Sequence, residues 1–240
     1  MHPPKPACRF SCLESAGEQD VVQLVCGDQG PAGNPGSHPG NDGPYRNLPS
    51  LPGIYPDYMA PIVRNQPDGR ELTMARWGMP SPAFALKGRK SDPGVTNVRN
   101  VSSPHWRRWL GVDSRCVVPF TSFAEHEVLP DGSRPPIWFA FNENRPLACF
   151  AGIWTHWTSV RKVKEGETSN DLFAFLTTEP SEPVRTYHPK AMPVILTTQA
   201  EIDQWMTAPT PQALELQRPL PDGDLIVVGR GTRKDEEGQD

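Results

Sequence analysis

The sequence lacks any long uninterrupted apolar stretch. Hydrophobic residues make up 36% and charged residues 22% of its 240 positions, and no apolar run approaches the roughly 20 residues that a membrane-spanning helix needs. An N-terminal apolar segment of the kind that directs secretion is also missing. The sequence therefore excludes a membrane-spanning protein and predicts a soluble one, with a single domain as the default.

Cysteine is scarce and odd in number. Of the five cysteines, Cys8, Cys12 and Cys26 lie near the N-terminus, whereas Cys116 and Cys149 stand alone in apolar runs. An odd count without a secretion signal argues against a disulfide framework and for a reducing compartment. We therefore expect a cytoplasmic protein.

Bulk positive charge and cofactor motifs are absent as well. The net charge is −4 and the pI about 5.9, so any contact with nucleic acid or acidic lipid needs a local basic patch. No Walker or dinucleotide-binding glycine pattern appears, and no set of His, Cys and carboxylates has the spacing of a metal site. The sequence predicts no cofactor and no metal.

Proline is the residue in excess, at 29 of 240 positions, about 12% against a usual ~5%. Residues 27–53 hold six prolines and seven glycines, with too little apolar surface to offset the entropy of ordering the chain. We expect an irregular Gly/Pro-rich segment at 1–46, a compact domain at 47–229 and a charged tail at 230–240.

The compact domain consists of short apolar runs bounded by Gly, Pro, Asp or Asn, a pattern typical of strands. The expected strands are 72–77, 116–124, 137–141, 148–154, 172–177, 194–197 and 225–228. The expected helices are short, at 104–110 with Ser103 as N-cap, at 199–206 and at 211–217. Together they predict an α+β domain with an antiparallel, barrel-like sheet and short flanking helices.

Polar residues interrupt this pattern at three places. Asn97 and Arg99 follow a Pro-Gly turn, where spacing alone favours a solvated loop and the functional interpretation is contact with phosphate or sugar. Glu125 ends an aromatic-rich strand, as either an exposed strand end or a carboxylate with a raised pKa that moves protons. A lone histidine such as His188 is usually structural, and Lys190 adds positive charge beside it.

Two further segments, 76–79 (RWGM) and 106–109 (WRRW), mix arginine with tryptophan. This combination is typical of single-stranded nucleic-acid binding, although most of the seven tryptophans in a domain of this size belong to the core.

These clusters together resemble the SOS response-associated peptidase (SRAP) family. The motifs 56–61 (PDYMAP), 76–79, 97–99 (NVR) and 115–119 (RCVVP) with Glu125, then His188 before 192–196 (MPVIL), recur in the family's order and spacing over about three quarters of the chain. The resemblance implies a SRAP-like fold and a monomeric sensor of abasic sites in single-stranded DNA. It also implies self-processing peptidase and lyase-like activity, with a covalent protein–DNA crosslink as the product.

In that family a cysteine at position two, exposed by removal of the initiator methionine, closes on the ring-opened sugar aldehyde as a thiazolidine. Carried over by residue, the resemblance implies that Asn97 positions this cysteine or the sugar and that Glu125 is the general acid/base. His188 would promote ring opening or hold the adjacent phosphate. The DNA-contacting positions implied by the resemblance are Trp77, Arg99, Lys190 and Pro61.

The sequence departs from the family at its start. Position two is His2, so the adjacent amine and thiol that the covalent chemistry requires are missing from the chain as written. We hypothesise that the residues before Asn47 come from a frameshifted or misassigned gene start, and a natural disordered extension is the competing explanation. Smaller departures are His126 in place of an aromatic residue, no glutamate shortly after 97–99, and one extra residue before Met192.

Several functions therefore remain open. The first is a covalent abasic-site crosslinker, and the second a non-covalent single-stranded DNA-binding module that has lost its nucleophile. A cysteine peptidase using Cys8 or Cys12 with His188 is a weaker alternative, because those cysteines lie in the irregular segment. A zinc site at Cys8 and Cys12 is weaker still, because it lacks two further ligands.

Overall fold

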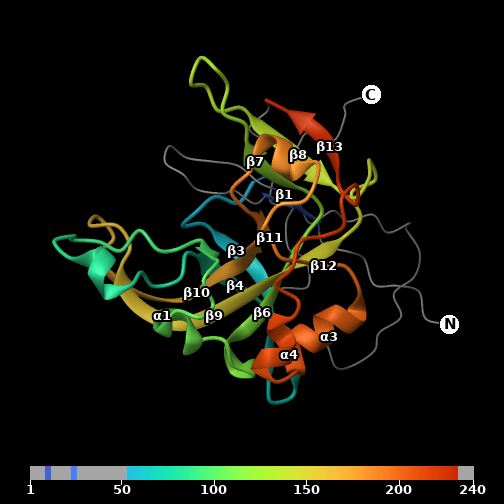
Figure 1. Cartoon of the computed structure of the whole chain (residues 1–240). Coiled ribbons are helices and arrows are strands. Elements are labelled where there is room, and N and C mark those ends of the chain that lie inside the picture. The colour runs from blue at the N-terminus through green and yellow to red at the C-terminus, as the bar shows by residue number, and fades with distance from the viewer. Residues whose placement is uncertain (1–8, 12–22, 26–52, 232–240) are drawn as a thin grey trace, which may run out of the picture.

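The computed structural model describes residues 9–11, 23–25 and 53–231, which are built mainly from strands (Figure 1). The strands are β1 Arg9–Ser11, β2 Gln23–Val25, β3 Met59–Gln66, β4 Gly69–Trp77, β5 Asn97–Val98, β6 Arg115–Phe120, β7 Phe123–His126, β8 Pro136–Ala140, β9 Ala148–Val160, β10 Glu167–Thr178, β11 Met192–Pro193, β12 Ile195–Leu196 and β13 Ile226–Arg230. The helices are η1 Ala83–Leu86, α1 Pro104–Arg107, η2 Val112–Ser114, α2 Val184–Tyr187, α3 Gln199–Thr207 and α4 Thr210–Leu214.

Five strands, β3, β4, β6, β9 and β10, close into a barrel. Four of the contacts around it, β4–β3, β3–β6, β6–β9 and β9–β10, are antiparallel. Strand directions cannot alternate all the way around an odd number of strands, so the closing contact of β10 with β4 is parallel, with Leu172 opposite Arg76. The predicted α+β, barrel-like fold is confirmed, and its sheet is mixed rather than wholly antiparallel.

Two smaller sheets accompany the barrel. Strands β7, β8 and β13 form an antiparallel sheet at the top of the view in Figure 1. Strands β1 and β2 pair antiparallel within the segment predicted to be irregular, and the other residues of 1–52 lie outside the described part.

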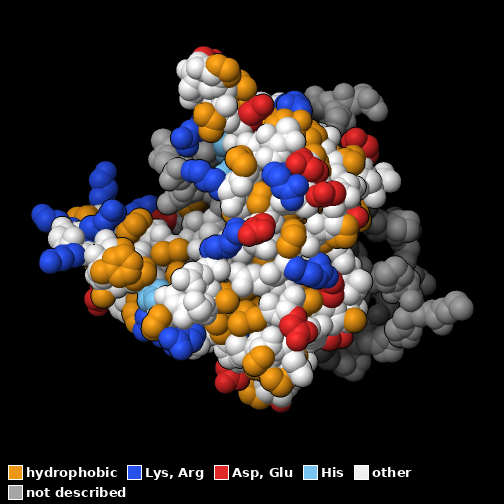
Figure 2. All heavy atoms as spheres, in the orientation of Figure 1, with side chains coloured by type: hydrophobic (Ala, Val, Ile, Leu, Met, Phe, Trp, Pro, Cys, Tyr) orange, Lys and Arg blue, Asp and Glu red, His pale blue; other side chains and the backbone are white. Residues whose placement is uncertain are grey.

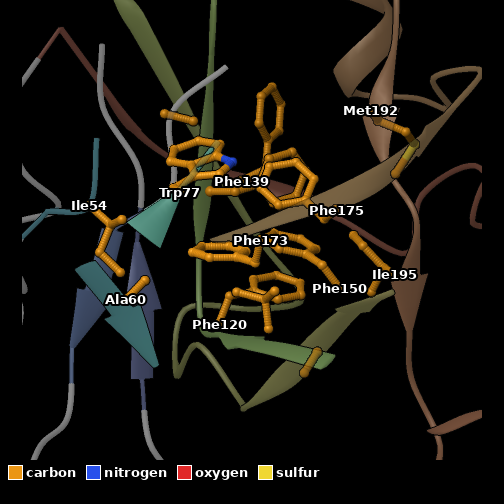
Figure 3. Packing of buried hydrophobic residues seen from close by; sticks show 14 of the residues in the cluster. Ile54, Ala60, Trp77, Phe120, Phe139, Phe150, Phe173, Phe175, Met192 and Ile195 are labelled. Carbon is orange, nitrogen blue, oxygen red and sulfur yellow. The ribbon is translucent and has the colours of Figure 1, made fainter. Parts of the chain in front are cut away.

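Strand β6 and the inner halves of β9 and β10 are buried on both faces. On β10, Phe173 and Phe175 join a cluster of aromatic rings with Phe120 and Phe150 (Figure 3). The intervening Ala174 belongs to a second cluster that includes tryptophans of the helices. Because both faces are apolar, these strands appear in the sequence as nearly continuous hydrophobic runs, and their central parts were predicted.

A buried arginine fixes the helical layer against the barrel. Arg115, the first residue of β6, donates to the carbonyl oxygens of Leu110 at 2.9 Å, Trp205 at 2.8 Å and Ala208 at 2.6 Å. Burial lowers the pKa of Arg115, and these acceptors offset part of the cost of removing its charge from water. The arginine of the RCVVP motif is therefore structural.

The helix starts predicted at 104 and 199 are confirmed, the third helix begins at Thr210 rather than at 211, and several strand boundaries differ. Ser103 caps α1 through an Oγ that accepts from the His105 N–H at 3.3 Å. The strand predicted at 116–124 is two strands, because the chain leaves the barrel between β6 and β7. Strand β9 continues past its predicted end at residue 154 to Val160, and β13 includes Arg230, which was predicted to lie in the tail.

Candidate functional site

The centre of the candidate site is a carboxylate–imidazole contact. Glu125 lies on β7 opposite Ile137 of β8 and is only 2% exposed. His188 is the C-cap of α2, which packs against β7, and its N–H donates to the Val184 carbonyl at 2.8 Å. His188 Nδ1 lies 3.6 Å from Glu125 Oε2. The structure thus brings together two of the three predicted catalytic residues.

This pair combines two groups whose chemistry allows them to accept or donate a proton. An ionised carboxylate only accepts hydrogen bonds, whereas an imidazole ring donates or accepts according to its protonation state. A separation of 3.6 Å is longer than a hydrogen bond, which is common in catalytic pairs before substrate binds. The arrangement therefore suits general acid–base chemistry.

His126, the residue after Glu125, is buried. Burial lowers the pKa of His126, with a further contribution from the charges of His188 and Arg134, to about 4. Its ring is therefore neutral at physiological pH.

The third predicted catalytic residue, Asn97, lies on β5, which pairs in parallel with β10 and places Asn97 opposite Phe175. Its Oδ1 is buried and accepts no hydrogen bond within the described part of the chain. Buried polar atoms are usually satisfied, so an unpaired amide oxygen marks a place where a ligand or another chain segment can donate.

The two predicted DNA-contacting cations are neighbours. Arg99 Nη1 donates to the Thr178 carbonyl at 2.6 Å and, at 3.5 Å, to the carbonyl of Lys190. Arg99 Nη2 lies 3.7 Å from the exposed Glu179 carboxylate. The side chains of Arg99 and Lys190 are both exposed beside the end of β10, where the Glu179 carboxylate offsets part of the charge of Arg99.

Trp77 and Pro61 lie inside the fold. Trp77 is fully buried, and its indole N–H donates to the Thr96 carbonyl at 3.1 Å. Pro61 is buried on β3, opposite Met74. In this conformation neither presents a surface on which a base can stack, so a DNA contact by either stays a prediction that requires the ring to become exposed.

Within residues 53–231 the most exposed large apolar side chain is Phe84 of η1, which is 83% exposed and was not predicted from the sequence. Exposed Lys87, Arg89 and Lys90 follow it, and Figure 2 shows Lys and Arg side chains gathered on the lobe at the left of the view. The sequence pattern that could have indicated it is the apolar tetrapeptide AFAL followed directly by the basic run KGRK. Adjacent apolar and basic residues in a loop are typical of an exposed binding surface.

The loop that carries Phe84 is clamped at its base. The buried Arg161 guanidinium donates to the carbonyls of Gly78 at 2.9 Å and Pro93 at 3.1 Å, one on each side of the loop. A Cβ added at Gly78 or Gly94 would overlap this guanidinium, and both residues have positive φ, of +131° and +80°. The loop therefore leaves and re-enters the fold at two positions that require glycine.

Asp57 fixes the position of the Arg161 guanidinium. It accepts from Arg161 Nε at 3.0 Å and from Arg76 Nε at 2.7 Å. Burial alone would raise the pKa of Asp57, but hydrogen bonds from Arg76, Lys162 and Arg161 lower it to about 2. The carboxylate thus stays ionised throughout the physiological range.

The predicted Arg–Trp helix divides between core and surface. Trp106 and Trp109 are buried, whereas Arg107 and Arg108 are exposed. The Arg108 guanidinium lies 4.1 Å above the Trp109 ring, and Trp109 packs edge-on against the partly exposed Trp157. The exposed surface of this helix therefore offers two arginines and the edge of one tryptophan ring. It does not offer the series of exposed aromatic rings on which successive bases could stack.

Cysteine and metal chemistry find no support among the described residues. Burial raises the pKa of Cys149 to about 12 and that of Cys116 further, so neither thiol is a ready nucleophile. No group of three or more His, Cys, Asp or Glu side chains within 53–231 could hold a metal ion. His2, Cys8 and Cys12 lie outside the described residues.

The family model described as "SOS response associated peptidase (SRAP)" matches residues 44–229. The chain belongs to the SRAP family. Membership assigns it, in general terms, a DNA-damage-associated, peptidase-like role that involves DNA. No helix among the described residues is long and apolar enough to cross a membrane.

The SRAP fold is also found in a solved structure. The chain is similar to a phage-related protein from Bordetella bronchiseptica, with 18% sequence identity and a TM-score of 0.55. The similarity covers 75% of this chain and 81% of the other, and at this identity it shows the fold alone. No match was found among curated proteins.

Proposed function

We propose that this SRAP protein recognises abasic sites in single-stranded DNA, with Glu125 and His188 as an acid–base pair. The contact of the 2% exposed Glu125 carboxylate with His188 Nδ1, at 3.6 Å, carries the proposal. An abasic sugar is a cyclic hemiacetal, which opens when its C1′ hydroxyl loses a proton and its ring oxygen gains one. The pair supplies a group for each transfer, and the free aldehyde results.

The surface charge supports a DNA ligand. The net charge of the chain is −4, yet Lys87, Arg89 and Lys90 are exposed next to Phe84. Single-stranded DNA is held by cations along its backbone and by aromatic rings on which bases stack. Phe84 offers such a ring in this conformation, and Arg99 with Lys190 offers a second cationic position.

A covalent product depends on the residue at the mature N-terminus. An α-amine condenses with the aldehyde and releases water as the C=N bond forms, and a neighbouring thiol then adds across that bond to close a thiazolidine. Without a thiol beside a free α-amine, the interaction would be reversible, and non-covalent binding of single-stranded DNA is therefore the second candidate function. A mature N-terminus that begins with cysteine would favour the crosslink.

Trapping of the aldehyde tests the acid–base pair without requiring a nucleophile. We expect the protein to accelerate the reaction of an abasic oligonucleotide with an alkoxyamine probe, and E125Q or H188Q to reduce this acceleration roughly 100-fold. The control E143Q changes an exposed glutamate and leaves the rate unaltered. Equal rates with and without the wild-type protein would refute the proposal.

Denaturation separates the two candidate functions. A shifted band that survives heat and detergent indicates a crosslink, and one seen only in a native gel indicates reversible binding. The intact mass of the purified protein identifies the N-terminal residue in the same sample. Equal affinity for abasic and intact oligonucleotides, with no heat-stable band, would exclude recognition of abasic sites and leave only general single-stranded DNA binding.

A further inference from the structure

The last strand, β13, contains a bulge that redirects one arginine. Val227 pairs with Phe139 of β8, but the register then shifts so that Arg230 lies opposite Ile137, and Val228 is the extra residue. Side chains alternate between the two faces of a strand, so one extra residue moves every later side chain to the other face. The bulge therefore determines which face of the sheet Arg230 occupies.

That face is the one that carries Glu125. Ile137 pairs with Glu125 of β7 as well as with Arg230 of β13, which places all three in one row across the sheet. Directly opposed residues of antiparallel strands project to the same side. Arg230 Nη1 also lies 3.7 Å from Oε2 of Glu127, the residue that directly follows β7.

The same guanidinium reaches α2. Arg230 Nη2 donates to the Tyr187 hydroxyl, and the Arg230 Cζ lies 4.6 Å above the Tyr187 ring. Tyr187 also packs against Phe139 of β8, with ring centroids 6.0 Å apart, and it directly precedes His188. Arg230 thus joins the neighbour of His188 to a residue two positions from Glu125.

We propose that Arg230 is a positioning residue that holds α2 against the β7–β8–β13 sheet and so sets the contact between His188 and Glu125. The part of this inference that concerns DNA rests on the proposed function. The family model ends at residue 229, so Arg230 lies just outside the matched region. A planar guanidinium can lie flat on a ring while its N–H groups point outward in a fixed fork, whereas a lysine ammonium has no flat face to place on the ring.

Magnetic resonance of the His188 imidazole tests the position directly. The His188 ring resonances of the full chain are assigned by their absence from H188Q. We expect R230M, R230K and Y187F to shift these resonances. The control R185M, which removes an exposed arginine of the same helix, leaves them in place. Unchanged tryptophan indole signals verify that each variant is folded. Unmoved His188 resonances in R230M would overturn the proposal.

Binding of a single-stranded oligonucleotide with one tetrahydrofuran abasic analogue supplies a second test. We expect R230M to weaken binding about threefold to tenfold in the wild-type background and to have little effect in H188Q, because coupled residues are not additive. Equal losses in both backgrounds would mean that Arg230 contacts DNA itself, which overturns the positioning role. If the wild-type chain ignores the abasic analogue, the proposed function fails, and the His188 resonances alone decide the role of Arg230.

Discussion

The two histidines beside Glu125 differ in their surroundings. His188 contacts the Glu125 carboxylate from α2 and is partly exposed. His126 is buried on β7, where burial and the charges of His188 and Arg134 lower its pKa to about 4. A neutral His126 is therefore part of the folded structure, and its protonation opposes folding.

We expect acidification to destabilise the protein through His126. The unfolded chain binds this proton near pH 6.5 and the folded chain only near pH 4, so the unfolded state holds more protons between these values. The stabilisation is complete above pH 6.5 and falls by about 2 kcal/mol between pH 7 and pH 5. Urea unfolding at both pH values measures it. The H126Q variant should lose this part of the pH dependence, and an unchanged dependence would contradict the assignment.

At the scale of elements, the segment between Gly78 and Gly94 is a projecting loop with a rigid base. Arg161 donates to carbonyls on both sides of it, and Asp92 accepts from the Ser81 hydroxyl at 2.5 Å and the Gly94 N–H at 2.8 Å. The exposed Phe84 and its basic neighbours are thus carried by a loop whose ends cannot move independently of the barrel.

The contact of Arg161 with the base of the loop predicts that alanine destabilises the protein more at Gly94 than at Gly88. Gly88 and Gly94 have similar φ values, +77° and +80°, but only a Cβ at Gly94 would meet the Arg161 guanidinium. We expect G88A to cost about 1 kcal/mol of backbone strain and G94A about 2 kcal/mol more, from overpacking. Urea unfolding measures both. Equal costs would mean that the guanidinium moves freely out of the way.

The elements differ in how far local sequence predicts them. Barrel strands such as β10 were predicted because both faces are buried and the run is apolar. Strand β3 and the outer half of β9 were missed, because their partly exposed positions carry polar residues. The break between β6 and β7 was missed since Thr121 and Ser122 fit a strand as well as a bend.

The site was predictable only in part. Polar interruptions of apolar runs pointed to Asn97, Glu125 and His188, and the family resemblance gave each of them a role. The contact between Glu125 and His188 joins segments far apart in the chain, so no local pattern could predict it. The role of Arg230 depends on the β13 bulge. Neither a turn-forming residue nor a change in hydrophobic periodicity marks this bulge in the sequence.

At the scale of the whole molecule, charge is unevenly distributed. The chain carries −4 overall, while the loop beyond η1 and the end of β10 expose Lys87, Arg89, Lys90, Arg99 and Lys190. Polyanion binding therefore depends on a few local contacts rather than on a general field.

The salt dependence of DNA binding measures how many phosphates these cations contact. If the three cations of the loop each neutralise one phosphate, the logarithm of the binding constant should fall with the logarithm of salt concentration with a contribution of about −2 to the slope. Combined alanine substitutions of Lys87, Arg89 and Lys90 should remove that contribution, and R185M should not. A slope unaffected by the triple substitution would place the DNA elsewhere.

The parallel contact that closes the barrel has a consequence for the order of folding. It joins Arg76 to Leu172, 96 residues apart in the chain, and β5 with Asn97 pairs with the same strand, β10. Contacts of such long sequence separation pay more loop-closure entropy than a local hairpin does, so we expect this contact to form after the β3–β4 hairpin. During refolding, recovery of DNA recognition therefore reports completion of the barrel, whereas recovery of local hairpins such as β3–β4 does not.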